Sequence, residues 1–298
     1  MKKPTITVIT PTYNRKDKLV ELYKSLSCQT SFDFDWLIID DGSIDNTETV
    51  VREIKEKECR FAIRYIKKQN GGKHTALNKA FRVADGELSI IVDSDDKLIE
   101  DAIKIIKKDW NKYKNKKDIC ALCYKRKNKK NIDICDDFGE KEIIANYNEF
   151  IINRRIRGDK AEVFITEIIN KYRFPSFKDE KFIGEGVLWS KISNNYDMVF
   201  INEAIYICDY LDDGLTKSGR KMRLKSPKGG MYHSHEYMSS NYKIDIRLKN
   251  ATLYIIYSLF AKEKISETIK NSGNRLLMIS CFMPAYLIYL IWKKKYES

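Results

Sequence analysis

The first hundred residues alternate between short, mostly apolar runs and stretches whose apolar residues recur at helical spacing. Runs of this kind, bounded by turn residues, are typical of buried strands. Four are expected to be such strands: residues 6–10, 36–39, 61–66 and 88–92. Amphipathic helices are expected between them, the first ending near Cys28 and the second near Glu56. Strands that alternate with helices predict an α/β fold, with a mixed, mostly parallel sheet covered by helices on both faces.

Polar residues gather directly after each of these strands. They read Pro-Thr-Tyr-Asn-Arg at 11–15, Asp-Asp-Gly-Ser at 40–43, Asn-Gly-Gly-Lys-His at 70–74 and Asp-Ser-Asp-Asp at 93–96. Parallel strands end on the same rim of a sheet, and open α/β sheets bind ligands at that rim. We therefore expect the four segments to form one site.

The segment 93–96 carries three carboxylates within four residues. Such a cluster of like charge is costly unless a divalent cation lies among the oxygens. The simplest use is a Mn²⁺ or Mg²⁺ ion that bridges a bound diphosphate. The alternative is a solvated acidic loop that caps a helix beginning near Glu100.

In order and spacing, these segments resemble the family-2 inverting glycosyltransferases of the GT-A fold. Three shorter matches lie between them: Gln29-Thr30, Ala76-Leu77-Asn78 and Gly86-Glu87. The resemblance is firm over about residues 4–100, looser over 155–215, and ends near residue 225. It implies a Rossmann-like GT-A domain at 1–225 and a helical C-terminal region at 226–298. Within the domain, it implies a nucleotide-binding half at 1–100 and an acceptor-binding, catalytic half at 101–225.

The resemblance also implies roles for the residues that match the family's motifs. Six are expected to bind the nucleotide, Lys73 at its diphosphate: Pro11, Tyr13, Arg15, Asp41, Lys73 and Asp93. Asp95 is expected to hold the metal, and Asp96 and Asp159 to meet the donor sugar, with Asp96 also a candidate metal ligand. The alternatives are a core aromatic for Tyr13 and an ordinary surface lysine for Lys73. Asp40 is interpreted as a buried acid that supports the turn.

Inverting transfer needs a carboxylate that removes the acceptor's proton, and the family takes it from a Glu-Asp pair at a helix start. The matching segment here reads Glu185-Gly186, so the second acid is missing and Glu185 is the expected base. A helix N-terminus would favour its charged form. The alternative is a glutamate that only caps the helix. Asp159, or an acid in 209–213, is the next candidate.

Other candidates have less support. His233 or His235 is a possible metal ligand, because imidazole suits Mn²⁺-type sites. The alternative is that each is a plain surface residue. Cys120 and Cys123 are expected to be core thiols on opposite faces of a strand. The basic run at 217–225 is either a solvated loop or a lid that closes on the diphosphate.

Composition adds the expected location. The net charge is +13, which suits nucleic acid or an acidic membrane surface, but no nucleic-acid-binding motif is present, so nucleic acid is excluded as the partner. Seven cysteines at irregular spacing argue against a disulfide framework, and no signal peptide precedes the first strand. Both observations indicate the cytoplasm, where nucleotide sugars are made. The run at 125–130 is interpreted as a solvated charged loop.

The C-terminal region is different in character. Residues 276–291 are almost wholly apolar, contain Pro284, and are followed by Trp292 and three lysines. This run is shorter than the ~20 residues that span a bilayer, and the lysines would lie on the wrong side of a single span. A helix on the inner face of the cell membrane, with its lysines on anionic lipid, fits better. The alternative is a helix packed on the domain or on a second subunit.

The sequence thus predicts a metal-dependent inverting glycosyltransferase. Its donor would be a nucleotide-diphosphate sugar, most simply a UDP-sugar, and its acceptor a hydroxyl of a glycan or lipid-linked precursor of a cell-surface polysaccharide. Two alternatives stay open. One is a nucleotidyltransferase that makes sugar nucleotides, although residues 11–15 lack the Gly-rich loop expected there. The other is a degenerate, non-catalytic binding protein at the membrane, since Gly186 replaces an acid.

Overall fold

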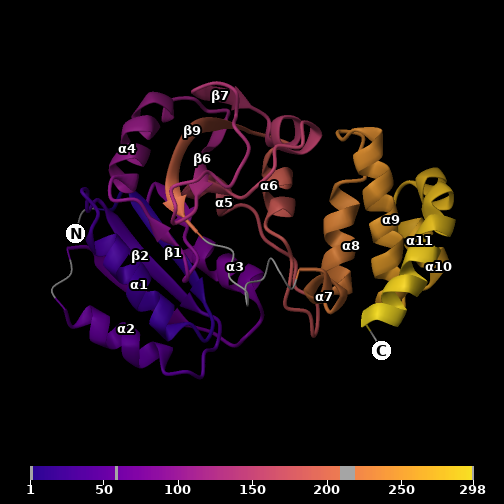
Figure 1. Cartoon of the computed structure of the whole chain (residues 1–298), viewed down its shortest axis with the longest axis horizontal. Helices are drawn as coiled ribbons and strands as arrows, with labels where there is room; N and C mark the ends of the chain where they lie inside the picture. The colour runs from indigo at the N-terminus through magenta and orange to yellow at the C-terminus, as the bar shows by residue number, and fades with distance from the viewer. Residues whose placement is uncertain (1–2, 58–59, 209–218, 297–298) are drawn as a thin grey trace.

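The computed structural model describes residues 3–57, 60–208 and 219–296. Its centre is one mixed sheet, to which every strand in those ranges belongs, with helices packed around it (Figure 1). The strand order is β3-β2-β1-β4-β8-β6-β9-β5, and β7 pairs with β9 beside this path. The longest ladders, β1 with β2, β2 with β3 and β6 with β9, are parallel. The predicted α/β architecture is confirmed.

The N-terminal half forms as its hydrophobic pattern requires. Its strands are β1 (Ile6–Thr12), β2 (Phe34–Asp40), β3 (Ala62–Lys67) and β4 (Leu88–Ile91). Its helices are α1 (Lys16–Ser27), α2 (Thr47–Lys55) and α3 (Lys73–Val83). The apolar faces of α1 and α2 pack in one core with Ile6 and Trp36, whereas α3 packs in another with Ile9 and Leu37. The helices therefore cover both faces, and all four parallel strands end on one rim.

The C-terminal half extends the same sheet. Its strands are β5 (Lys97–Leu98), β6 (Ile119–Lys127), β7 (Glu142–Ala145), β8 (Lys160–Ile165) and β9 (Asp197–Ile207). Its helices are α4 (Ala102–Tyr113), the π-helix η1 (Asn148–Asn153), α5 (Thr166–Ile169) and α6 (Gly186–Ile192). Strand β8 runs antiparallel to both β4 and β6 and so joins the two halves.

Two predictions about β6 are wrong. The strand continues through Lys127, so the start of the predicted charged loop at 125–130 is strand, and Lys125 is buried against Asp133. The ladder with β9 is irregular between Ile119 and Ala121. Because this bulge offsets the alternation of side chains, Cys120 and Cys123 share one core cluster instead of facing opposite sides. Both are free, buried thiols, in agreement with a core role.

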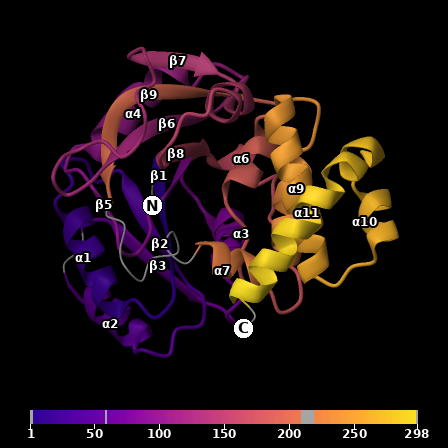
Figure 2. The ribbon, with the colours of Figure 1, turned by 45° about the vertical axis from the view of Figure 1, so that its right-hand side comes forward.

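Five helices follow the sheet domain in the described residues. They are α7 (Gly219–Leu224), α8 (Pro227–Glu236), α9 (Ile244–Phe260), α10 (Ile265–Asn271) and α11 (Arg275–Tyr296). Helix α8 lies between the sheet domain and the last three helices (Figure 1). Helix α11 crosses α9 (Figure 2), and the two share a separate apolar core around Ala251, Ile255 and Met278. The division at residue 225 stays a prediction.

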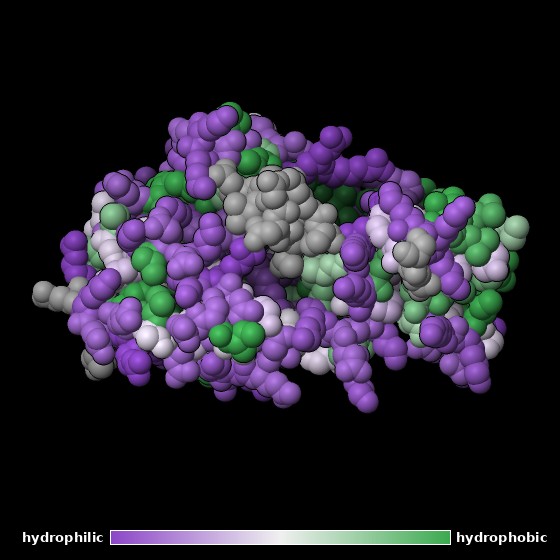
Figure 3. All heavy atoms as spheres, turned by 60° about the horizontal axis from the view of Figure 1, so that its bottom comes forward, coloured by the Kyte–Doolittle hydropathy of each residue, from purple (hydrophilic) through white to green (hydrophobic). Residues whose placement is uncertain are grey.

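Helix α11 is longer than its apolar run suggested. It extends over 22 residues, about 33 Å, with Pro284 inside it, so the argument that it is too short to span a bilayer is wrong. It is the one described helix long and apolar enough to cross a membrane. Only one face packs on α9, and the opposite face exposes a stripe of apolar residues: Leu276, Ile279, Met283, Tyr286, Leu287, Leu290 and Ile291. Hydrophobic surface gathers over the C-terminal helices (Figure 3).

Candidate active site

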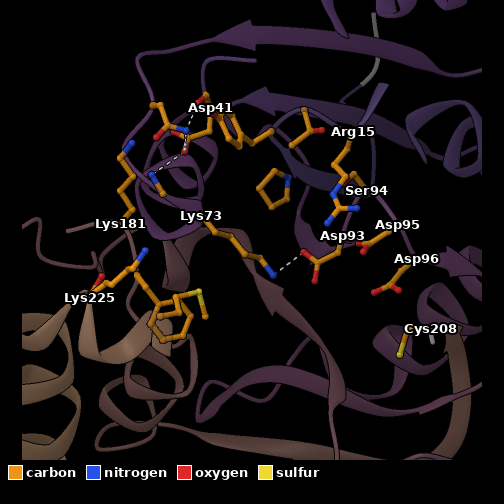
Figure 4. A pocket seen from close by; sticks show the side chains of 18 of the residues that line it. Arg15, Asp41, Lys73, Asp93, Ser94, Asp95, Asp96, Lys181, Cys208 and Lys225 are labelled. Atoms are coloured by element: carbon orange, nitrogen blue, oxygen red, sulfur yellow. Dashed lines mark hydrogen bonds and ion pairs between the residues drawn. The ribbon is translucent and has the colours of Figure 1, made fainter. Parts of the chain in front are cut away.

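A cavity of about 750 Å³ opens at the carboxyl ends of β1, β2 and β4. Its walls include every residue predicted to meet nucleotide, donor sugar or metal, apart from the two histidines: Pro11, Tyr13, Arg15, Asp41, Lys73, Asp93, Asp95, Asp96 and Asp159. Figure 4 shows the acidic segment 93–96 facing the cavity from one side and Asp41 from another, with Lys73 between them. Tyr13 is 47% exposed, which argues against the core-aromatic alternative. The four polar segments thus meet on one rim, as expected.

Asp41 organises the loop that follows β3. Its carboxylate accepts hydrogen bonds from the backbone N–H groups of Gly71 and Gly72, at 3.0 and 2.7 Å, and from the Asn70 side chain at 3.2 Å. Lys68 adds an ion pair at 2.6 Å. Two carboxylate oxygens offer about four acceptor sites, so these partners fill the capacity of Asp41. Asp40 supports the turn as interpreted, since it accepts from the Ser43 backbone and the Tyr65 hydroxyl.

The loop needs glycine at position 72. Gly72 has φ 91° and ψ 159°, a backbone conformation that is essentially restricted to glycine. A Cβ atom there would lie 2.0 Å from the carbonyl oxygen of Lys181, which lines the same cavity. The loop after β3 is therefore pressed against the segment that leads to Glu185.

Lys73 connects the acidic segment 93–96 to the expected base. Its ammonium lies 2.6 Å from a carboxylate oxygen of Asp93 and 2.6 Å from one of Glu185. Burial alone would lower the pKa of Lys73, but these two carboxylates outweigh it and raise the pKa, so the ammonium stays charged. Glu185 stands at the N-terminus of α6, yet its side chain makes no capping hydrogen bond. This argues against the alternative that Glu185 only caps the helix.

The acidic segment carries charge that a cation would balance. Burial raises the pKa of Asp96 to about 7, and the charge of Asp93 adds to this rise, although the Tyr206 hydroxyl donates to Asp96 at 2.8 Å. Asp95 makes no hydrogen bond or ion pair with any described residue. Carboxylate oxygens are hard ligands that suit Mg²⁺ or Mn²⁺, so this donor set fits the predicted ion. In the described residues, no three His, Cys, Asp or Glu side chains already converge as a cage.

Sequence reasoning missed Arg126. It lines the cavity from β6, stacks on the Tyr206 ring at 4.0 Å and lies 3.8 Å from Asp96. Behind it, Glu162 of β8 is partly buried. Burial raises the pKa of Glu162 to about 7, and the Glu185 charge adds to this while Arg126 opposes it. The signal for Arg126 was hidden because its neighbours are lysines, which made the segment look like a solvated loop.

The basic run and the histidines lie at different places. Lys221 and Lys225 line the cavity beside Lys181, as a diphosphate clamp would require. Lys217 and the alternative acids at 209–213 lie outside the described residues. His233 lines a second cavity, and His235 lines neither. The structure therefore does not bring a histidine to Asp95.

Comparison with known proteins gives the relatives of this chain. The sequence model of the family described as glycosyl transferase family 2 matches residues 7–164. A Campylobacter jejuni protein named GalNAc(5)-diNAcBac-PP-undecaprenol beta-1,3-glucosyltransferase is 27% identical, over 97% of this chain and 93% of its own length. Other curated relatives match over shorter stretches, and the chain spans 16% to 41% of their lengths.

Solved structures share the fold. One is S. aureus TarS 1–349 in complex with UDP-GlcNAc, with a TM-score of 0.64 and 18% identity, over 90% of this chain and 79% of that one. Another is the mannosyltransferase PcManGT of Pyrobaculum calidifontis in complex with GDP-Man and Mn²⁺, with a TM-score of 0.59 and 17% identity, over 100% and 89% of the two chains. The predicted GT-A fold is confirmed by this likeness.

Proposed function

The chain belongs to glycosyl transferase family 2, and we propose that it moves a sugar from a UDP-sugar to a hydroxyl of a glycan or lipid-linked acceptor, with inversion. The observation that carries the proposal is the position of Lys73 between Asp93 and Glu185. It ties the donor side of the cavity to a carboxylate suited to act as a base. The complex of TarS with UDP-GlcNAc and the lipid-linked acceptor in the Campylobacter enzyme's name support the substrate classes.

In this proposal, the uracil and ribose lie against Pro11, Tyr13 and Arg15. Asp41 is committed to the loop after β3, so it acts mainly by holding that loop in shape. Lys73 faces the diphosphate, and Lys181, Lys221 and Lys225 add positive charge around it.

Glu185 takes the proton of the acceptor hydroxyl while that oxygen attacks the anomeric carbon. The bond from the anomeric carbon to the diphosphate oxygen breaks on the opposite face, and one displacement inverts the configuration. Asp95, with Asp96, would hold a Mn²⁺ or Mg²⁺ ion, whose positive charge would stabilise the leaving diphosphate. Asp159 would contact the donor sugar.

We also propose that the exposed stripe of α11 lies on a membrane surface on the cytoplasmic side, in a pathway that builds cell-surface polysaccharide. The stripe continues into Lys293, Lys294 and Lys295, which suit anionic lipid. Contact with a second copy of the chain is the competing use of the same face.

The test is a screen of nucleotide sugars with Mn²⁺ that reads UDP release with and without a glycolipid extract. Glu185→Gln should lower transfer roughly 10²–10⁴-fold while UDP still binds. Glu167→Gln, on the surface of α5, is the matched control and should change nothing. Near-normal transfer by a folded Glu185→Gln variant would refute the assignment of Glu185 as the base. Pyrophosphate release from a nucleoside triphosphate would favour a nucleotidyltransferase, and donor binding without turnover on any acceptor would favour a binding protein.

A further inference from the structure

A second cavity of about 630 Å³ lies between η1 and helices α7 to α9. It shares Phe182 with the donor cavity, so one side chain forms a wall of both. Gly184, which precedes the expected base, also lines it, and a Cβ atom on Gly184 would lie 3.7 Å from the His233 ring. The segment that carries Glu185 therefore separates the two cavities.

The second cavity is fixed in place by contacts between the C-terminal helices and this segment. Glu180 accepts hydrogen bonds from the backbone N–H groups of Lys228 and Gly229 at the start of α8, both at 2.8 Å. Gly230 packs against Tyr257 of α9 so closely that a Cβ atom would lie 2.7 Å from the ring. The cavity is therefore a built feature of the domain junction.

The walls of the second cavity are amphipathic. Isoleucine, leucine and tyrosine side chains form its apolar part: Ile151, Ile152, Ile156, Ile246, Leu253 and Tyr257. Arg155, Arg157, Arg223 and Lys249 also line it, against one carboxylate in the described lining, Asp245, which pairs with Arg155. The cavity thus combines excess positive charge with an apolar wall.

Two further observations indicate a ligand. The hydroxyl of Ser234 is fully buried in the lining and has no hydrogen-bond partner among the described residues. A buried hydroxyl without a partner is costly, so it suits a site whose partner arrives with the ligand. Burial lowers the pKa of His233 to about 4, and the positive charges of Arg223 and Lys249 lower it further. His233 is therefore neutral near pH 7, and the cavity around it has a positive potential.

We propose that this second cavity binds the acceptor, and that the acceptor is a lipid-linked phosphate or diphosphate. Its phosphate oxygens would meet Arg223, Lys249 and Ser234, and the first part of its lipid would lie on Ile246 and Leu253. Its sugar would then face Phe182 and the Glu185 segment. This inference rests on the proposed function, because only a transferase needs an acceptor site here.

The test uses farnesyl diphosphate as a short isoprenoid diphosphate, with inorganic pyrophosphate and farnesol as comparison ligands. Calorimetric titrations are made with saturating UDP, so that the donor cavity is filled and cannot take the diphosphate. Farnesyl diphosphate should bind at least ~10-fold more tightly than either comparison ligand, because it alone offers both the charge and the chain. Equal affinity for pyrophosphate would show a free-phosphate site and overturn the proposal.

Variants locate the site. Exchange of both Arg223 and Lys249 for Gln should weaken the binding of farnesyl diphosphate at least ~10-fold. The same exchange of Lys264 and Lys270, which are exposed at α10, is the matched control and should leave this affinity unchanged. Ser234→Ala should weaken the binding of farnesyl diphosphate about fivefold. It should not lower Tm, because the lost hydroxyl leaves no hydrogen-bond partner unsatisfied in the free protein. An unchanged affinity in the Arg223 and Lys249 variant would overturn the proposal. UDP affinity is measured for each variant in a separate titration without farnesyl diphosphate, so failure of the donor site is seen separately.

Discussion

Replacement of Gly72 by alanine tests the contact between the loop after β3 and the Lys181 segment. The added methyl group would lie 2.0 Å from the Lys181 carbonyl oxygen, and alanine would also have to adopt φ 91° and ψ 159°. The backbone conformation costs about 1–3 kcal/mol and the overpacking a further ~1–3 kcal/mol. At roughly 2 °C per kcal/mol for a chain of this size, Tm should fall by roughly 4–12 °C.

Gly139→Ala is the matched control. Gly139 has φ 90°, but a Cβ atom there would meet nothing within 4 Å, so only the backbone part of the cost applies. Differential scanning fluorimetry gives Tm, and calorimetry gives UDP affinity. Gly72→Ala should lower Tm more than the control does. Gly72→Ala should also weaken the binding of UDP at least ~10-fold, because the Gly72 N–H that orders Asp41 must move. Equal Tm and UDP affinity in the two variants would refute the reasoning.

Three further predictions follow from the site and the C-terminal helices. Asp95→Asn, or chelation of the wild type, should lower turnover at least ~10²-fold, about 2.7 kcal/mol, with an unchanged Tm; full activity in either case would exclude a metal role. Ile279→Glu with Ile291→Glu, both on helix α11, should abolish binding to anionic vesicles, whereas Ile132→Glu, in an exposed loop after β6, should not; loss of dimers in sedimentation instead would favour self-association. Ionisation of Glu162 costs more in the folded chain, so stability should be highest below the ordinary glutamate pKa and fall by ~1–3 kcal/mol as pH rises through about 7. Glu162→Gln should make this fall smaller, although buried Asp96, whose pKa is also raised to about 7, keeps a part of it. Identical Tm profiles for both proteins from pH 5 to 8 would contradict the prediction.

The fold of the N-terminal half could be predicted well from the sequence because its signals are local. Each strand is a short apolar run, and the polar residues that follow it share a rim whenever the strands are parallel. This geometry brought Tyr13, Asp41 and Asp95 to one cavity without further information.

The missed features depend on distant contacts. Arg126 lines the cavity because β6 continues beyond its apolar part, pairing with β9 through Lys127 and with β8 through Lys125. The second cavity requires the packing of α8 and α9 on the Glu185 segment, which no periodicity within those helices indicates. The length of α11 was underestimated because lysines after Trp292 continue the helix, although they end the apolar run.

The position of β8 in the sheet has a consequence for synthesis of the chain. Strand β4 pairs with β1 on one side and with β8 on the other, and β8 follows it by about seventy residues. At ~5–20 residues per second, the ribosome leaves the second edge of β4 uncovered for roughly 4–14 s. An uncovered apolar edge is a template for pairing with other chains. The N-terminal half, although it holds most of the proposed nucleotide contacts, therefore keeps one edge of β4 unpaired until β8 is made, and we expect a chain shortened before Lys160 to aggregate.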